Sequence, residues 1–220
     1  MKKIPLGELA FAIGMLLTCA GVALMVRSDL GLSMIAAPAY ILSEKFGPLT
    51  TGTAEWCVQG AVFVLGCILI GKFSMPMLLS FLVAALNGAV LDMMLRLFAF
   101  ATPISFAARL AVWFIGLILL ALGIAFAFRS YLPCQMHEMF VKTVADARGW
   151  SRDKCKIVYD WIFLALSLTL SLLFFRHLVG IGIGTVLATL LNGPCIVLWG
   201  KVLDKWFNFE PALKKRSARQ

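Results

Sequence analysis

The chain has 220 residues, of which 61% are hydrophobic and 14% are charged, and its formal net charge is +9. Soluble domains are close to half apolar and a quarter charged, so this composition excludes an ordinary soluble fold. The basic excess does not indicate a nucleic-acid partner, because its distribution along the chain matches a membrane-orientation signal.

Six stretches are long and apolar enough to cross a membrane. A helix that spans a bilayer needs about 20 mostly apolar residues. The six stretches leave little sequence for a soluble domain, so we predict an all-α polytopic membrane protein that forms a single integral membrane domain over 1–220. In chain order, the predicted transmembrane helices are 8–26, 53–71, 75–95, 107–128, 157–175 and 178–200.

The basic residues predict the orientation of these spans. If the N-terminus is cytoplasmic, 15 of the 20 Lys and Arg residues fall in cytoplasmic segments. Cytoplasmic loops of membrane proteins carry such an excess. We therefore predict a multi-pass protein of the bacterial cell membrane with both termini in the cytoplasm. The basic tail, 205–220, is expected to contact anionic lipid.

The two halves of the chain repeat one another. Residues 21–31 read GVALMVRSDLG and residues 123–133 read GIAFAFRSYLP, an offset of 102 that later becomes 105. A three-residue insertion after Gly149 explains the change of offset. The matched pairs are Gly21 with Gly123, Arg27 with Arg129, Ser28 with Ser130, Leu30 with Leu132, Gly47 with Gly149, Glu55-Trp56 with Asp160-Trp161, and Leu86-Asn87-Gly88 with Leu191-Asn192-Gly193.

Each repeat contains three predicted spans. Because three is an odd number, the second copy has to enter the membrane from the opposite side. This is an inverted-topology arrangement of the kind found in secondary transporters. We predict the first repeat at about 8–97 and the second at about 107–204.

A short segment follows the first span of each repeat. These segments, 31–47 and 133–149, are too short to span and form either re-entrant or interfacial helices. The second is the more polar, which favours a surface position for it. Interrupted segments at matching places in both halves point to a binding site between them.

Three motifs carry a resemblance to a known family. They are SDLGLSMIAAPAYILS at 28–43, KCKIVYD at 154–160 and VGIGIGTVLATLLNGP at 179–194. On these motifs the chain resembles the bacterial YczE/YitT-type integral membrane proteins. The resemblance implies a polytopic plasma-membrane protein associated with small-molecule export, with no cofactor and no catalytic set. Met34 and Ile183 depart from the pattern, since proline and an acidic residue are common there.

Two asparagines are the predicted substrate ligands. Asn87 and Asn192 each precede a glycine deep in the third span of a repeat, and Pro194 removes a backbone hydrogen bond beside the second. A polar amide beside a loosened helix suits substrate binding near the midplane. Hydrogen bonding between helices through small-residue packing is the equal alternative.

Acidic residues are the candidates for ion coupling or gating. Glu55 and Asp160 begin the second span of each repeat, where a helix dipole alone also explains an acid. Asp92 lies four residues before Arg96, so an ion pair along one helix face competes with a gating role. Glu138 follows His137 in the second short segment, where a solvated helix face is the simpler interpretation.

Arginines and glycines complete the candidates. Arg27 and Arg129 end the first span of each repeat, so they either extend toward the interface or bind and gate an anionic substrate. The glycine series at 180–184 has neither the preceding strand nor the lysine of a phosphate loop. It suits close packing or a turn, or a broken helix start that faces an anion.

No catalytic residue, metal site or cofactor is expected, because the six cysteines form no C-x-x-C pair and no catalytic pair has a usable spacing. The leading hypothesis is an ion- or proton-coupled exporter of a small organic compound. One alternative is a six-span substrate-binding subunit that docks on a separate ATPase. Another is a non-transporting membrane factor that assists a biosynthetic or regulatory complex. The expected partners are the lipid bilayer, an unidentified small molecule, and either a second copy of the chain or an ATPase.

Overall fold

A computed structural model describes residues 4–5, 7–101, 103, 105–130 and 135–208. Two predicted features lie outside the described residues, namely the pairing of Leu30 with Leu132 and most of the basic tail. The described chain is helical, apart from a two-residue parallel pairing of β1 (Ile4–Pro5) with β2 (Phe207–Asn208). The helices are α1 (Gly7–Ser28), α2 (Ala37–Lys45), α3 (Thr51–Ile70), α4 (Met75–Leu97), α5 (Phe106–Arg129), α6 (Met136–Arg148), α7 (Arg152–Phe175) and α8 (Ile183–Trp206), with a 3-10 turn η1 (Phe98–Phe100) after α4.

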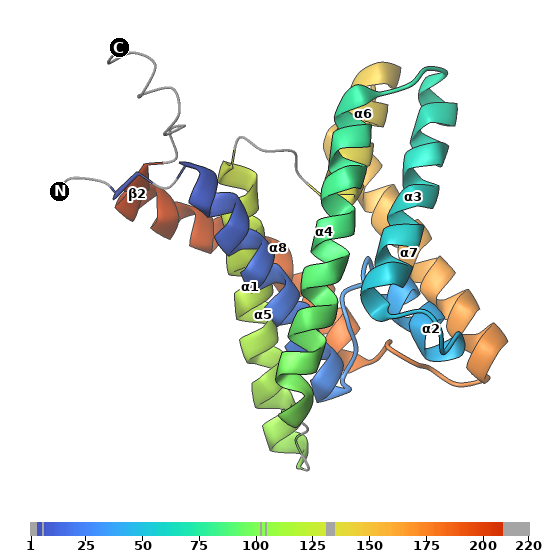
Figure 1. Ribbon diagram of the computed structural model, residues 1–220, viewed down its shortest axis with the longest axis vertical. Helices are drawn as coiled ribbons and strands as arrows, with labels where there is room; N and C mark the ends of the chain where they lie inside the picture. The colour runs from blue at the N-terminus through green and yellow to red at the C-terminus, as the bar shows by residue number, and fades with distance from the viewer. Residues whose placement is uncertain (1–3, 6, 102, 104, 131–134, 209–220) are drawn as a thin grey trace.

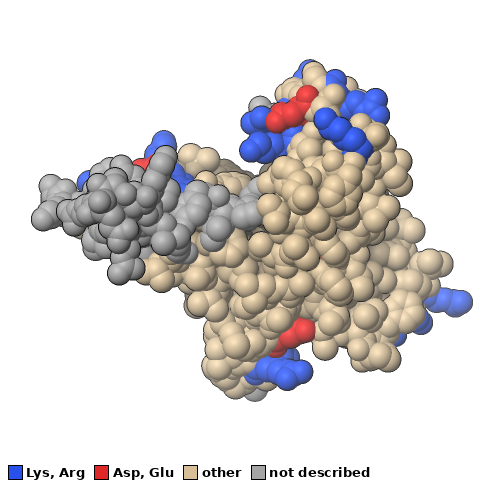
Figure 2. All heavy atoms as spheres, turned by 45° about the horizontal axis from the view of Figure 1, so that its top comes forward, with Lys and Arg blue, Asp and Glu red and all other residues tan. Residues whose placement is uncertain are grey.

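Six of the helices, α1, α3, α4, α5, α7 and α8, are long and apolar enough to cross a membrane. Figure 1 shows the two short helices at opposite ends of the molecule, α2 at the lower end and α6 at the upper end. We call these the α2 end and the α6 end. Charged side chains gather at both ends, and a wide belt without them lies between, as expected for a bilayer-spanning protein (Figure 2). The chain is therefore a multi-pass membrane protein.

Two predicted boundaries were displaced. The fifth span was expected from 157, but α7 begins at Arg152, because a polar turn extends the helix beyond its apolar part. The sixth was expected from 178, but α8 begins at Ile183. Gly180 has φ +70, and its carbonyl accepts a hydrogen bond from the Leu32 N–H at 2.9 Å. The glycine series therefore runs as a bent segment against the chain that follows α1.

The centre of the fold is a seam between α1 and α5, which run antiparallel. A Cβ atom added to Gly21 would lie 2.6 Å from the Gly116 carbonyl oxygen, and one added to Gly14 would lie 2.9 Å from that of Gly123. The two helices therefore touch backbone to backbone, as small residues allow in membranes. The repeat offset of 102 matches Gly14 to Gly116 and Gly21 to Gly123. The contact of Gly14 with Gly123 in one repeat order is therefore equivalent to the contact of Gly116 with Gly21 in the other.

The remaining helix pairs also occur in corresponding sets. α1 packs on α4 and α5 packs on α8; α2 contacts α3 and α7, and α6 contacts α7 and α3. Two pairs break the correspondence. α4 packs on α6, whereas the matching α8 and α2 do not pack on one another within the described residues. α3 and α4 pack closely, with Gly52 against Gly88, whereas α7 and α8 do not pack along one another within the described residues. At the matching positions Ile157 is 57% exposed and Gly193 has open space around it.

Candidate functional site

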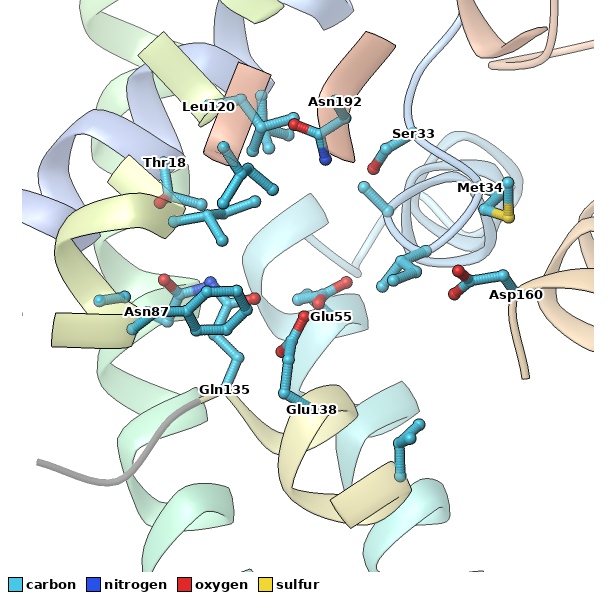
Figure 3. Close-up of a pocket in the computed structure, with 18 of the residues that line it drawn as sticks. Thr18, Ser33, Met34, Glu55, Asn87, Leu120, Gln135, Glu138, Asp160 and Asn192 are labelled. Carbon is cyan, nitrogen blue, oxygen red and sulfur yellow. The ribbon is translucent and has the colours of Figure 1, made fainter. Parts of the chain in front are cut away.

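All eight helices contribute to one cavity of about 1060 Å³. It extends toward the α6 end, where Lys142 and Arg152 border it. Figure 3 shows polar side chains directed into it from several helices. Five of the eight predicted site residues line this cavity, although they come from five different helices: Glu55, Asn87, Glu138, Asp160 and Asn192.

The two asparagines have different environments. Asn87 is 9% exposed, and its Oδ1 accepts a hydrogen bond from the Cys19 thiol at 3.3 Å. The Oδ1 atom of Asn192 is buried and has no hydrogen-bond partner among the described residues. A buried acceptor without a partner costs about 1–3 kcal/mol. Asn192 is therefore the polar group of this wall that most needs a ligand or water.

Glu55 lies in a buried hydrogen-bond chain that joins three helices. Its Oε1 accepts from Gln59 Nε2 at 2.9 Å and lies 3.3 Å from His137 Nε2. The other ring nitrogen, His137 Nδ1, lies 2.5 Å from the Tyr159 hydroxyl. The chain thus connects α7 through α6 to α3 and ends at a carboxylate on the cavity wall.

The interpretation of His137 and Glu138 as a solvated helix face was wrong for the histidine. His137 is 1% exposed and stacks edge-on against Phe163. It shares its face of α6 with Phe140, Val141 and Val144, which follow it at helical spacing. This apolar spacing in the sequence could have indicated that the ring is buried. Tyr159 and Gln59 were not predicted, and no motif singles them out.

The basic residues at the cavity border are engaged differently. Lys156 Nζ lies 2.7 Å from Asp160 Oδ1, one turn along α7. Asp160 was expected at a helix start, but it lies more than two turns inside α7, so this lysine rather than the helix end compensates its charge. Arg152 pairs with the exposed Asp146. The hydrogen bond and the positive charge of Arg152 lower the pKa of the Asp146 carboxyl group.

A second cavity of about 520 Å³ lies at the α2 end and includes Arg27 and Asp92. Asp92 accepts from the backbone N–H of Gly52 at 2.7 Å and from the Thr50 hydroxyl at 2.5 Å. It therefore caps the start of α3. The expected ion pair with Arg96 is not formed in the described structure, because the Asp92 carboxylate is turned to this helix end.

Tyr40 lines both cavities, from α2. Burial raises the pKa of Tyr40 to about 12, and the negative charges of Glu44 and Asp29 add to the effect. The phenol therefore stays a neutral hydrogen-bonding group at any physiological pH. Tyr40 was not among the residues predicted from the sequence.

The repeated arginines each bind a neighbouring helix near its end. Arg27 Nη2 donates to the Leu95 carbonyl on α4 at 2.7 Å. Arg129 forms a two-point ion pair with Asp204 on α8, with both distances 2.6 Å, and its guanidinium lies against Gly200. The offset of 105 carries Leu95 to Gly200, so the two arginines occupy matching places. Neither arginine lines the large cavity.

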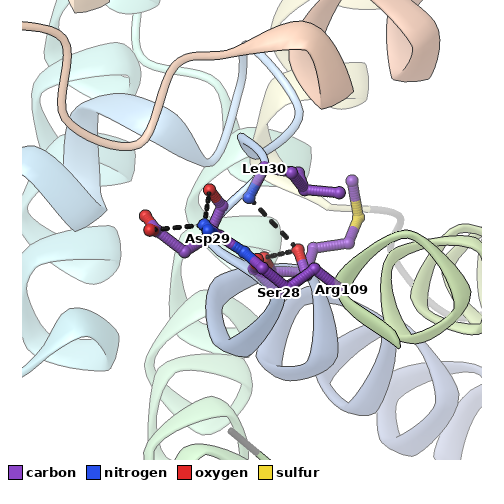
Figure 4. A network of polar contacts seen from close by, with 5 residues as sticks. Ser28, Asp29, Leu30 and Arg109 are labelled. Carbon is purple, nitrogen blue, oxygen red and sulfur yellow. Dashed lines mark hydrogen bonds and ion pairs between the residues drawn. The ribbon is translucent and has the colours of Figure 1, made fainter. Parts of the chain in front are cut away.

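Arg109 was not predicted as a structural residue. Its Nε donates to the Ser28 carbonyl and its Nη2 to the Asp29 carbonyl, each at 2.7 Å (Figure 4). Nη2 also lies 2.6 Å from Asp29 Oδ2. Asp29 has φ +52, so the chain turns sharply after α1. Arg109 thus ties the start of α5 to the end of α1.

Within the described residues, no group of three or more His, Cys, Asp or Glu side chains is placed to hold a metal ion. The fold and its cavity define the class of protein, a multi-pass helical membrane protein with a cavity lined by its helices. The chain belongs to DUF6198, a family of unknown function, which matches residues 6–201. No curated protein and no solved structure matches the chain. The similarity to YczE/YitT-type proteins stays a prediction.

Proposed function

We propose that the protein is an ion- or proton-coupled transporter that exports a small organic compound across the bacterial cell membrane. It would consist of two inverted three-span repeats, with both termini in the cytoplasm and the α6 end on that side. Asn87 and Asn192 would contact the substrate, and Glu55, Glu138 and Asp160 would couple its movement to an ion. Arg27, Arg129 and Asp92, which bind neighbouring helix ends, would act in gating.

The contacts of α1 and α5 support the two repeats. Gly14 meets Gly123 and Gly21 meets Gly116, and the repeat offset exchanges these two contacts. A pseudo-two-fold axis through the seam between these helices would produce this exchange. The contacts of Arg27 with Leu95 and of Arg129 with Gly200 follow the same relationship.

The observation that carries the proposal is the difference between α3–α4 and the matching pair α7–α8. α3 and α4 close on one another through Gly52 and Gly88, and the matching α7 and α8 are apart. A transporter built from inverted repeats changes its access side when the two repeats exchange conformations. The present structure would then be the state open at the α6 end. In the other state, Ile157 and Gly193 would approach one another.

Cysteine cross-linking in membranes tests this exchange. In a background without the six native cysteines, Ile157→Cys and Gly193→Cys are combined and treated with a short bifunctional thiol reagent. We expect an intramolecular cross-link, detected as an intact bridge after proteolysis between α7 and α8. Each single variant is the control. If the pair never cross-links in a protein that is folded and inserted, the alternating exchange is wrong.

A further inference from the structure

We infer that the ligand of the large cavity is an organic cation that carries N–H donors, a protonated amine or a guanidinium with an apolar body. The inference rests on the proposed function in using the same cavity, and it adds the chemical class of the substrate. It follows from three features of the cavity wall: its uncompensated charge, its unpaired acceptors and its apolar area.

The uncompensated charge near the centre of the cavity is negative. Asp160 is neutralised by Lys156 at 2.7 Å, and the charge of Arg152 is neutralised by Asp146, which lies outside the cavity lining. The two remaining acids, Glu55 and Glu138, point toward one another from α3 and α6 in Figure 3.

Neither of these two acids has a cationic lysine or arginine partner within the described residues. Glu55 is bonded only to an amide and to His137. Glu138 makes no hydrogen bond or ion pair there. Lys142, one turn further along α6, borders the cavity but pairs with neither acid in the described structure, so the wall carries two acids and one unpaired lysine. Two facing carboxylates repel one another unless a positive charge or a proton lies between them. A cationic ligand supplies that charge.

The wall contains acceptors that no described donor satisfies. A carboxylate accepts hydrogen bonds and donates none. The Asn192 Oδ1 atom is a further acceptor, buried and without a partner among the described residues. The carboxylates on α3 and α6 therefore face a ligand that has to bring donors. Ammonium and guanidinium groups have three and five N–H donors, respectively, and no acceptor.

The rest of the wall is apolar. Side chains from α4, α5 and α8 complete it, and the volume of about 1060 Å³ is at the upper end for a drug-sized ligand. Such walls favour a hydrocarbon or aromatic body attached to the charged head. The large apolar lining residues on these three helices are Leu79, Leu91, Leu120, Ile124, Phe128 and Ile196.

A matched series of small probes tests the inference on the purified full-length protein in detergent. The probes share one phenylbutyl body and differ in the head group: 4-phenylbutylamine, its trimethylammonium analogue, 4-phenylbutanol and 4-phenylbutyrate. Binding is measured by calorimetry and by the thermal unfolding midpoint. We expect the amine to bind, the trimethylammonium analogue to bind more weakly because it lacks N–H donors, and the alcohol and the acid not to bind.

Two substitutions that each remove one negative charge locate the charge. Glu138→Gln should weaken amine binding about tenfold or more, because a charge-assisted hydrogen bond contributes about 1.5–3 kcal/mol. Asp29→Asn is the control, since neither this acid nor its partner Arg109 lines the cavity, and it should leave amine binding unchanged. Because Glu138 has no partner among the described residues to lose, its substitution should not unfold the protein.

Equal binding of the alcohol and the amine, preferred binding of the acid, or no binding by any probe would overturn the inference. So would amine binding that Glu138→Gln leaves intact in a folded protein. None of these results affects the transporter proposal, because the cross-linking of α7 to α8 tests that proposal independently of the ligand.

Discussion

Asp92, near the end of α4, accepts a hydrogen bond from the backbone N–H of Gly52 in the first turn of α3 at 2.7 Å. The Thr50 hydroxyl donates to the other carboxylate oxygen. A negative charge at a helix start also interacts favourably with the helix dipole. One side chain thus fixes where α3 begins and holds α3 against α4.

Asp92→Ala should therefore destabilise the protein by about 0.5–2 kcal/mol, the usual cost of losing a helix cap. Thermal unfolding in detergent measures this. The same variant should bind 4-phenylbutylamine as the unmodified protein does, because Asp92 does not line the large cavity. Unchanged stability would show that the cap contributes nothing.

Gly88 and Gly193 provide a matched pair of substitutions, because they hold the same place in the two repeats. A Cβ at Gly88 would lie 2.4 Å from the Gly52 carbonyl oxygen, whereas Gly193 has nothing within 4 Å. Gly88→Ala should cost about 1–3 kcal/mol from overpacking. Gly193→Ala should leave the unfolding midpoint unchanged or raise it, because alanine favours a helix. Equal effects of the two substitutions would contradict the difference between α3–α4 and α7–α8.

Asn192→Leu should not lower stability, because Asn192 Oδ1 is a buried acceptor with no partner among the described residues. Removing an unpaired polar group relieves its desolvation cost. The variant should nevertheless lose affinity for 4-phenylbutylamine. Asn87→Leu is the comparison: it removes the bond to the Cys19 thiol, so it should lower the unfolding midpoint. A clear loss of stability in Asn192→Leu would mean that its amide is already satisfied.

The raised pKa of Tyr40, about 12, predicts a pH dependence at the alkaline end. Because the folded state favours the neutral phenol, its contribution to stability is complete below pH 10 and is lost as the pH rises toward 12. Absorbance of tyrosinate should show a component near 12 that Tyr40→Phe removes. A Tyr40 component that titrates near 10 would show that the phenol is not buried.

The sequence predicted the helical class and the six long apolar helices, because hydropathy alone determines them. It also selected Glu55, Asn87 and Asn192, which the structure brings to one cavity. The starts of α7 at Arg152 and of α8 at Ile183 were not predicted. Polar residues extend α7 on the N-terminal side of its apolar part, and the bent glycine segment before Ile183 makes α8 begin later than expected.

Contacts between distant segments could not be predicted from single residues. Asp92 was paired with Arg96 by spacing along one helix, but its partners Thr50 and Gly52 lie about 40 residues away in sequence. His137 was interpreted as part of a solvated helix face, whereas the tertiary structure buries its ring against Tyr159. The spacing of Phe140, Val141 and Val144 indicates the burial but not the partner. In both cases the partner is on another helix, and no local pattern encodes it.

The seam between α1 and α5 has a consequence for the timescale of motion. Its contacts are formed by backbone atoms at Gly14, Gly21, Gly116 and Gly123, so there are no side-chain rotamers at these points to rearrange. Local opening is least frequent where backbone is most tightly enclosed. Amide hydrogens along this seam should therefore exchange with deuterium last in the molecule, while those of α7 and α8 near Ile157 and Gly193 exchange first among the long helices.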